Sequence, residues 1–140
     1  LKVGVFGLGI DPKGLIPDKL FGKVKYLDPF EVSEQQVAYL KNEAGCDLVV
    51  CLSHLGHKYK EEGKPSDLRL AKEVPGIDVI IGGHTHTFLP EPVKVDHAGG
   101  KSTLVCQVGH SGIRLGRLDF RLRLDRAGWK LRKHSASEVR

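Results

Sequence analysis

The sequence lacks several features that quickly place a chain in a class of proteins. It has 140 residues, no methionine, one tryptophan and an aromatic content of only 6%. None of its apolar runs approaches the roughly 18 residues of a membrane-spanning helix, so we expect no membrane span. So few aromatic side chains also offer little surface for stacking on nucleic-acid bases. An integral membrane protein is therefore disfavoured, and no nucleic-acid partner is expected.

Cysteine is scarce as well. The three cysteines, Cys46, Cys51 and Cys106, fit neither the paired spacing of zinc ribbons nor a CxxC redox motif. Their odd number argues against a disulfide framework, although it does not fix the compartment. Cys51 and Cys106 lie inside apolar segments, where cysteine acts as a small buried hydrophobic residue. We therefore expect these side chains to pack in a core.

Charge is present but unevenly distributed. Hydrophobic residues make up 40% of the chain and charged residues 28%, which is typical of one globular domain. The formal net charge is +5, and nine lysines and arginines fall within residues 114–140. Arg121 and Arg123 alternate with apolar residues, as in a strand with one solvated face. The alternative, an anion-binding or nucleic-acid-binding tail, predicts binding that depends strongly on salt.

The first residues of the chain predict a β-strand. Residues 2–8 are largely apolar and end at Gly7-Leu8-Gly9. A sequence without methionine that opens in a strand has the character of a segment of a longer protein. We therefore expect further chain before Leu1, and any targeting segment would lie there.

The hydrophobic pattern predicts a mixed α/β fold with antiparallel strands at its C-terminal end. A helix is expected after Asp28, with Ser33 as its N-cap and Gly45 at its end. A second helix begins at Ser66, with Asp67 favoured in its first turn by the helix dipole. Strands are expected at 2–8, 47–53, 79–81, 93–96, 103–108, 115–124 and 129–133, and residues 135–140 are expected to fray.

The most informative stretch combines a short strand, two glycines and two histidines. Residues 79–81 form a continuous apolar run, which is typical of a strand covered on both faces. Gly82 and Gly83 let the backbone turn tightly and approach a ligand closely. His84 and His86 follow two residues apart, a spacing that lets both imidazoles face one centre. Imidazole is the commonest metal ligand among side chains, although many His-x-His pairs are merely exposed to solvent.

A third histidine strengthens the metal interpretation. His54 directly follows the apolar strand at residues 47–53. Consecutive strands joined by a helix form a parallel, right-handed unit, so the carboxyl ends of these two strands are expected to lie side by side. This arrangement brings His54 close to His84 and His86, although about thirty residues separate them in sequence.

These motifs resemble the later half of the calcineurin-like metallophosphoesterases, with the best match to the 5′-nucleotidase and UDP-sugar hydrolase family. The resemblance extends from Lys2 to about Leu124. It is carried by Leu-Ser-His-Leu-Gly-His at 52–57, Ser-Asp at 66–67, Val-Pro-Gly-Ile-Asp-Val-Ile-Ile-Gly-Gly-His-Thr-His at 74–86, Gln-Val-Gly at 107–109 and residues 112–116.

The resemblance implies a fold, a chemistry and a set of ligands. Residues 1–134 are expected to form the later half of a four-layer α/β/β/α sandwich, followed by the frayed 135–140. His54 and His84 would bind one divalent metal ion and His86 a second, the ions being Zn, Mn, Fe or similar. In such enzymes a metal-bound hydroxide attacks the phosphorus of a nucleotide or another phosphate ester. His57 and His110 are candidates for the substrate pocket, with a surface position as the alternative for His57.

The family's earlier motifs, Asp-x-His, Gly-Asp-x-x-Asp and Gly-Asn-His-Glu/Asp, do not occur here. Three imidazoles without a carboxylate leave the repulsion between two close dications unneutralised. We therefore expect at most one weak metal site, no catalytic residue in this chain, and no activity without an N-terminal half on the same or a separate chain. A non-catalytic scaffold or partner-binding fragment is the alternative. The family implies nucleotide catabolism in the periplasm or at the cell surface.

Overall fold

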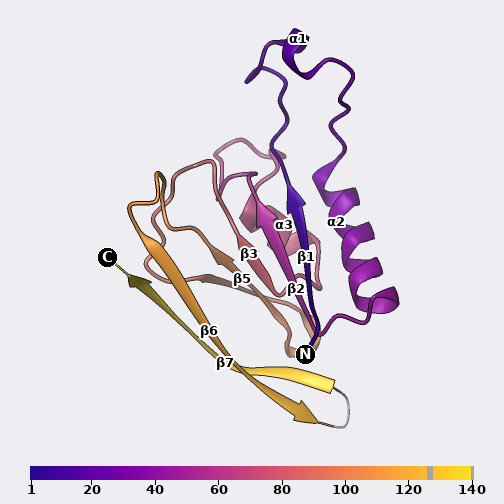
Figure 1. Cartoon of the computed structure of the whole chain (residues 1–140), viewed down its shortest axis with the longest axis vertical. Helices are drawn as coiled ribbons and strands as arrows, with labels where there is room; N and C mark the ends of the chain where they lie inside the picture. The colour runs from indigo at the N-terminus through magenta and orange to yellow at the C-terminus, as the bar shows by residue number, and fades with distance from the viewer. Residues whose placement is uncertain (126–127, 140) are drawn as a thin grey trace.

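The computed structural model describes residues 1–125 and 128–139. It contains a five-stranded sheet, flanking helices and a separate two-stranded hairpin (Figure 1). The elements in chain order are β1 (Val3–Leu8), α1 (Asp18–Phe21), α2 (Pro29–Ala38) with a π-helical turn (Tyr39–Glu43), β2 (Leu48–Ser53), α3 (Asp67–Glu73), β3 (Val79–Ile81), β4 (Val93–Asp96), a 3-10 turn (Ala98–Gly100), β5 (Ser102–Cys106), β6 (Leu115–Asp125) and β7 (Gly128–Val139).

The strand order of the main sheet is β1-β2-β3-β5-β4. Strands β1, β2, β3 and β5 are parallel, whereas β4 pairs with β5 in the antiparallel sense. Strands β6 and β7 form the antiparallel hairpin. The mixed α/β class with antiparallel C-terminal strands is therefore confirmed. Within the described ranges, no helix is long and apolar enough to cross a membrane.

One face of the sheet forms the hydrophobic core with helices α2 and α3. Val49 and Ile80 point into this core and are fully buried, as is Leu70 of α3. Leu40, in the turn that continues α2, packs against the core from the β1 side. A Cβ on Gly4 would lie 2.9 Å from Leu40 Cδ2, so the absent side chain of Gly4 lets this turn approach β1.

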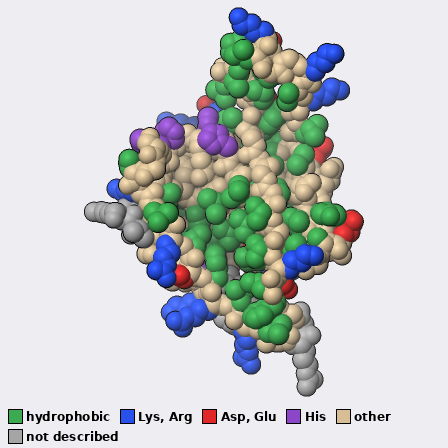
Figure 2. Space-filling view, viewed as in Figure 1, with side chains coloured by type: hydrophobic (Ala, Val, Ile, Leu, Met, Phe, Trp, Pro, Cys, Tyr) green, Lys and Arg blue, Asp and Glu red, His purple; other side chains and the backbone are tan. Residues whose placement is uncertain are grey.

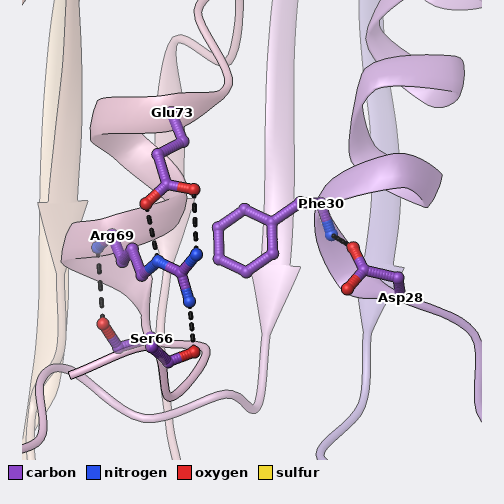
Figure 3. Close-up of polar contacts among 6 residues, drawn as sticks. Asp28, Phe30, Ser66, Arg69 and Glu73 are labelled. Carbon is purple, nitrogen blue, oxygen red and sulfur yellow. Dashed lines mark hydrogen bonds and ion pairs between the residues drawn. The ribbon is translucent and has the colours of Figure 1, made fainter. Parts of the chain in front are cut away.

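Arg69 links the two helices that cover this face (Figure 3). Its guanidinium lies over the ring of Phe30 in α2, 4.5 Å from the centroid. Its Nε donates to Glu73 within α3 at 2.6 Å. A cation over an aromatic face is worth up to about 1 kcal/mol at a partly exposed site. The contact therefore helps to fix α2 relative to α3.

The opposite face of the sheet is apolar and open. Val5 is 55% exposed, Leu52 50% and Ile81 44%, and hydrophobic side chains occupy the centre of this face in Figure 2. A cavity of about 240 Å³ adjoins it, between the ends of β3 and β5 and the β6–β7 hairpin. The expectation that β2 and β3 are covered on both faces holds only in part, since Leu48 and Val79 on this face are buried, whereas Leu52 and Ile81 are about half exposed.

Two expected boundaries differ from the structure. The N-cap of α2 is Asp28, whose Oδ1 accepts hydrogen bonds from the amides of Phe30 and Glu31. Asp followed by Pro at the first helical position is a strong start signal, so the helix begins before Ser33. Ser33 instead lies buried inside the helix and donates to the carbonyl of Pro29.

The C-terminal strand is longer than expected. Strand β7 continues through residues 135–139, which were expected to fray, because they pair with the beginning of β6, where Val139 lies opposite Leu115. Arg140 lies outside the described residues. Residues 9–26 were expected to form a loop, and in the structure a single helical turn, α1, interrupts it.

Asp67 is a charged side chain buried beneath the ends of two strands. It is 0% exposed, and its Oδ1 accepts a 2.5 Å hydrogen bond from Ser53 Oγ at the end of β2. Its Oδ2 would lie 2.1 Å from a Cβ on Gly82, at the end of β3, so only glycine fits there. Burial raises the pKa of Asp67 to about 6, although the hydrogen bond from Ser53 opposes the rise.

This carboxyl group makes stability depend on pH in a defined direction. Between its ordinary pKa of 3.8 and about 6, the folded chain holds a proton that the unfolded chain has lost. The free energy of unfolding therefore falls as pH rises through this interval, by up to about 3 kcal/mol. In urea unfolding from pH 4 to pH 7, the wild type should lose up to about 3 kcal/mol relative to Asp67→Asn, a comparison in which the opposite effect of the lowered pKa values of His57 and His84 cancels. Asp96→Asn, which removes an exposed carboxylate, is the control, and an equal pH dependence in all three chains would contradict the prediction.

Candidate metal centre

The carboxyl ends of β2 and β3 lie side by side, as the sequence predicts. Leu52 pairs with Ile81 in the parallel register, so His54 and His84 leave the sheet at neighbouring positions. The amide of His54 donates to the carbonyl of Leu8, which also ties this loop to β1. In Figure 2, histidine side chains gather at the end of the visible face toward which β1, β2 and β3 point.

His54 and His84 form a close pair. Their ring centroids are 5.3 Å apart, with the planes inclined at 68°. A Zn–N bond of about 2.1 Å holds a ring centroid about 3.2 Å from the ion, so two imidazoles on one tetrahedral ion have centroids roughly 5 Å apart. A Cβ on Gly83 would lie 3.0 Å from His54 Nδ1, so glycine here leaves room for the ring. The spacing of this pair fits one metal ion.

The backbone of the second histidine loop is strained. His84 has φ of 71° and His86 has φ of 53°, both in the left-handed region that side chains with a Cβ rarely adopt. The amide of Thr85 donates to the carbonyl of Gly83, which closes a tight turn between the two glycines and the histidines. Such residues cost on the order of 1–3 kcal/mol each and persist only where the surroundings hold them.

The half-buried His84 is held toward its neutral form. Burial lowers its pKa, and the charges of His54, Lys64 and His86 lower it further. Neutral imidazole is the form that binds a metal ion, because its nitrogen lone pair is then free. His54 and His86 are more exposed, so their rings are accessible from solvent.

His86 lies beside His110 in the structure. Their ring centroids are 4.7 Å apart and the planes are inclined at only 32°. Phe88 meets His110 edge-on at 5.8 Å, and the guanidinium of Arg114 lies 4.6 Å from the centroid of Phe88. The structure therefore brings the pocket candidate His110 to the predicted ligand His86. Among the residues that the structure describes, no group of three or more His, Cys, Asp or Glu side chains is placed to hold one metal ion.

His57 is placed differently from the other candidate for the substrate pocket. It is only 5% exposed, which excludes the surface position, and its amide donates to Thr85 Oγ1 at 2.9 Å. Burial, followed by the charge of Lys58, lowers its pKa. Its Nδ1 is buried and has no hydrogen-bond partner within the described part of the chain. His57 therefore lies buried in the loop that carries His54, where it contacts the loop of His84 and His86 through Thr85.

Sequence reasoning missed the side chains that connect the two loops. Gln107, which is 2% exposed, donates from Nε2 to the carbonyl of Gly83 at 2.8 Å and accepts from Thr87 and Thr85. Thr85 Oγ1 in turn lies 3.0 Å from Thr87 Oγ1. The available signal was a polar residue directly after the apolar residues 104–106 of the strand expected at 103–108, because a buried amide side chain requires partners.

Comparisons with known proteins were made by sequence and by structure. No family model matches the sequence. The chain is 36% identical over 119 residues to the trifunctional nucleotide phosphoesterase protein YfkN of Bacillus subtilis, covering 84% of this chain and 7% of that protein. It is 33% identical over 148 residues to a 2′,3′-cyclic-nucleotide 2′-phosphodiesterase/3′-nucleotidase of Salmonella typhimurium, covering 97% of this chain and 22% of that protein.

The solved structures agree in fold. The crystal structure of the calcineurin-like phosphoesterase YfkN from Bacillus subtilis superposes with a TM-score of 0.75 at 24% identity, over 97% of this chain and 44% of that one. The chain thus spans less than half of each of these relatives. The resemblance deduced from the histidine motifs is confirmed. By sequence this chain is a relative of the nucleotide phosphoesterases, and it has the fold of part of a calcineurin-like phosphoesterase.

Proposed function

We propose that this chain is the later part of a metal-dependent phosphoesterase domain that hydrolyses phosphate esters of nucleotides or nucleotide sugars. The observation that carries the proposal is the pairing of His54 and His84 at the ends of adjacent parallel strands. The names of the relatives from Bacillus subtilis and Salmonella typhimurium support a nucleotide substrate.

The three predicted ligands have separate roles in this proposal. His54 and His84 contribute imidazoles to one divalent ion, and His86 contributes to a second, with His110 beside it. The donor set is nitrogen, which suits zinc, iron or manganese. When bound, such ions bring the pKa of a bound water toward neutrality and offset charge on the phosphoryl group. The histidines of this chain would hold the ions.

Negative ligands must come from elsewhere. Two dications in such sites lie about 4 Å apart, and their repulsion requires bridging or flanking carboxylates. Asp67 does not supply them, because its carboxyl group is buried against Ser53 and Gly82. The chain alone is therefore a weak single-ion site, and an N-terminal half of the domain completes it.

Metal binding tests the ligand assignment directly. The wild-type chain should bind about one Co²⁺ or Zn²⁺ ion weakly, and His54→Ala and His84→Ala should each weaken this binding at least tenfold, because each removes one of two imidazoles. Isothermal titration and the visible absorption of Co²⁺ measure the effect. His134→Ala, which removes a histidine on the distant β7, is the control. Equal binding by all four chains would contradict the assignment.

The open face of the sheet is the proposed contact with that other half. Val5, Leu52 and Ile81 expose apolar side chains on one face of the sheet; Leu52 pairs with Ile81, and Val5 pairs with Val50, two residues before Leu52. Contiguous apolar surface of this kind marks an interaction site. Because Leu52 and Ile81 directly precede the histidine loops, a layer packed on them also reaches the metal ligands.

Complementation tests this contact. The partner is the segment that precedes the matched region in the Bacillus subtilis relative, co-expressed with this chain. The co-expressed pair should hydrolyse a nucleoside monophosphate, whereas this chain alone should not. Val5→Asp should weaken association at least tenfold, because an unpaired carboxylate is costly to bury. Leu20→Asp, an equally drastic change on the exposed α1, is the control. Brisk hydrolysis by this chain alone, or unaltered association of Val5→Asp with the partner segment, would contradict the proposal.

A further inference from the structure

Gln107 occupies a position from which one side chain reaches the whole histidine loop. It lies immediately after β5, whose last residue, Cys106, pairs with Ile81 of β3. The carbonyl of Cys106 also accepts from the amide of Gly82 at 2.7 Å, which holds the start of the loop against β5. The side chain of Gln107 is 2% exposed, so it acts away from solvent.

The amide group of Gln107 binds on both sides of His84 and His86. Its Nε2 donates to the carbonyl of Gly83, the residue before His84, at 2.8 Å. Its Oε1 accepts from the amide of Thr87, the residue after His86, and from Thr85 Oγ1 between the histidines at 3.2 Å. One side chain thus contacts every residue that flanks the two predicted ligands.

The same network reaches the first histidine loop. Thr85 Oγ1 accepts from the amide of His57, three residues after His54. Gly56 makes this contact possible, because a Cβ there would lie 2.7 Å from Thr85 Cγ2. The loops after β2 and β3 are therefore joined through Thr85 and Gln107, in addition to the sheet.

The strained backbone explains why such a support is needed. His84 and His86 both have positive φ, which the loop must maintain against more favourable conformations. The hydrogen bonds from Gln107 fix the carbonyl before this segment and the amide after it. Loss of these bonds frees the loop to relax, and the imidazoles then move with their backbone.

We propose that Gln107 is a positioning residue that holds His84 and His86 in the orientation required of metal ligands. The inference rests on the proposed metal role of these histidines, but its geometric part can be tested without a metal. Gln107 itself touches neither the substrate nor the metal in this proposal. It acts only through the carbonyl of Gly83, the amide of Thr87 and the hydroxyl of Thr85.

Two variants test the acceptor and donor hydrogen bonds of the Gln107 side chain separately. Gln107→Met keeps the length of the side chain and loses all three hydrogen bonds. Gln107→Glu keeps an acceptor for Thr87 and Thr85 but loses the donor to Gly83. Thr103→Val is the matched control, because Thr103 is a fully buried polar residue of β5 whose Oγ1 donates to the carbonyl of Ile77 and lies 2.9 Å from His97 Nε2, away from His84 and His86.

The first readout is NMR of the metal-free chain. In Gln107→Met, amide hydrogen exchange at Thr87 should accelerate at least tenfold beyond any change in global stability, and the ring resonances of His84 and His86 should shift. Gln107→Glu should retain the protection of Thr87, since its acceptor remains. If Gln107→Met does not fold, the ring resonances of His84 and His86 in Gln107→Glu decide the inference: they should shift because the donor to Gly83 is lost, and unchanged resonances would overturn it. Thr103→Val should leave these signals as in the wild type.

The second readout is the affinity for Co²⁺, measured by its visible absorption. Supporting residues behind metal ligands typically contribute a factor of about 10–100 in affinity, so Gln107→Met should bind Co²⁺ at least tenfold more weakly than Thr103→Val. A wild-type chain that binds no Co²⁺ would overturn the proposed function, while the exchange and ring signals would still decide the geometric role. Unchanged signals at residues 84–87 in Gln107→Met, or equal changes in Thr103→Val, would overturn the inference.

Discussion

The parallel pairing of β2 with β3 is the constraint on which the site depends. Because Leu52 lies opposite Ile81, the two strands end at one edge of the sheet, and their histidine loops begin together. No contact between the imidazoles is needed to bring them close, since the backbone hydrogen bonds of the sheet do so. The centroid separation of 5.3 Å between His54 and His84 then follows from register and from the small size of Gly83.

The same strands couple the site to the open face of the sheet. On the helix side, Cys51 and Ile80 are fully buried in the core, whereas the neighbouring Leu52 and Ile81 face outward and are about half exposed. A sheet with one apolar face uncovered is unfavourable in water, at roughly 25 cal/mol for each Å² left exposed. A layer that covers Leu52 and Ile81 removes this cost and arrives within reach of His54 and His84. Assembly and completion of the metal site are thus one event in the proposed enzyme.

Much of the fold and the main histidine pair were predictable from sequence, because both follow from periodicity and strand order. The parallel strands, the antiparallel pairing of β4 with β5, and the nearness of His54 to His84 are confirmed. The contact of His110 with His86 was not predictable, since the loop conformations that create it leave no periodic signal. The buried amide of Gln107 left only one signal, a polar residue directly after an apolar run, which does not identify its partners. Apolar runs, moreover, do not distinguish a strand already covered on both faces from one that still exposes an apolar face.

The polar residues beneath the loops explain how exposed imidazoles are held in strained positions. Asp67 lies under Gly82 and accepts from Ser53, while Gln107 binds the carbonyl of Gly83. Each is almost completely buried, so its hydrogen bonds are not exchanged for bonds to water. A loop fixed only by surface contacts relaxes from positive φ, whereas one fixed from inside the fold keeps its geometry before any metal arrives. In the proposed enzyme, the support for the histidine ligands is therefore built into the core of this chain, and the negative charge comes from the other half of the domain.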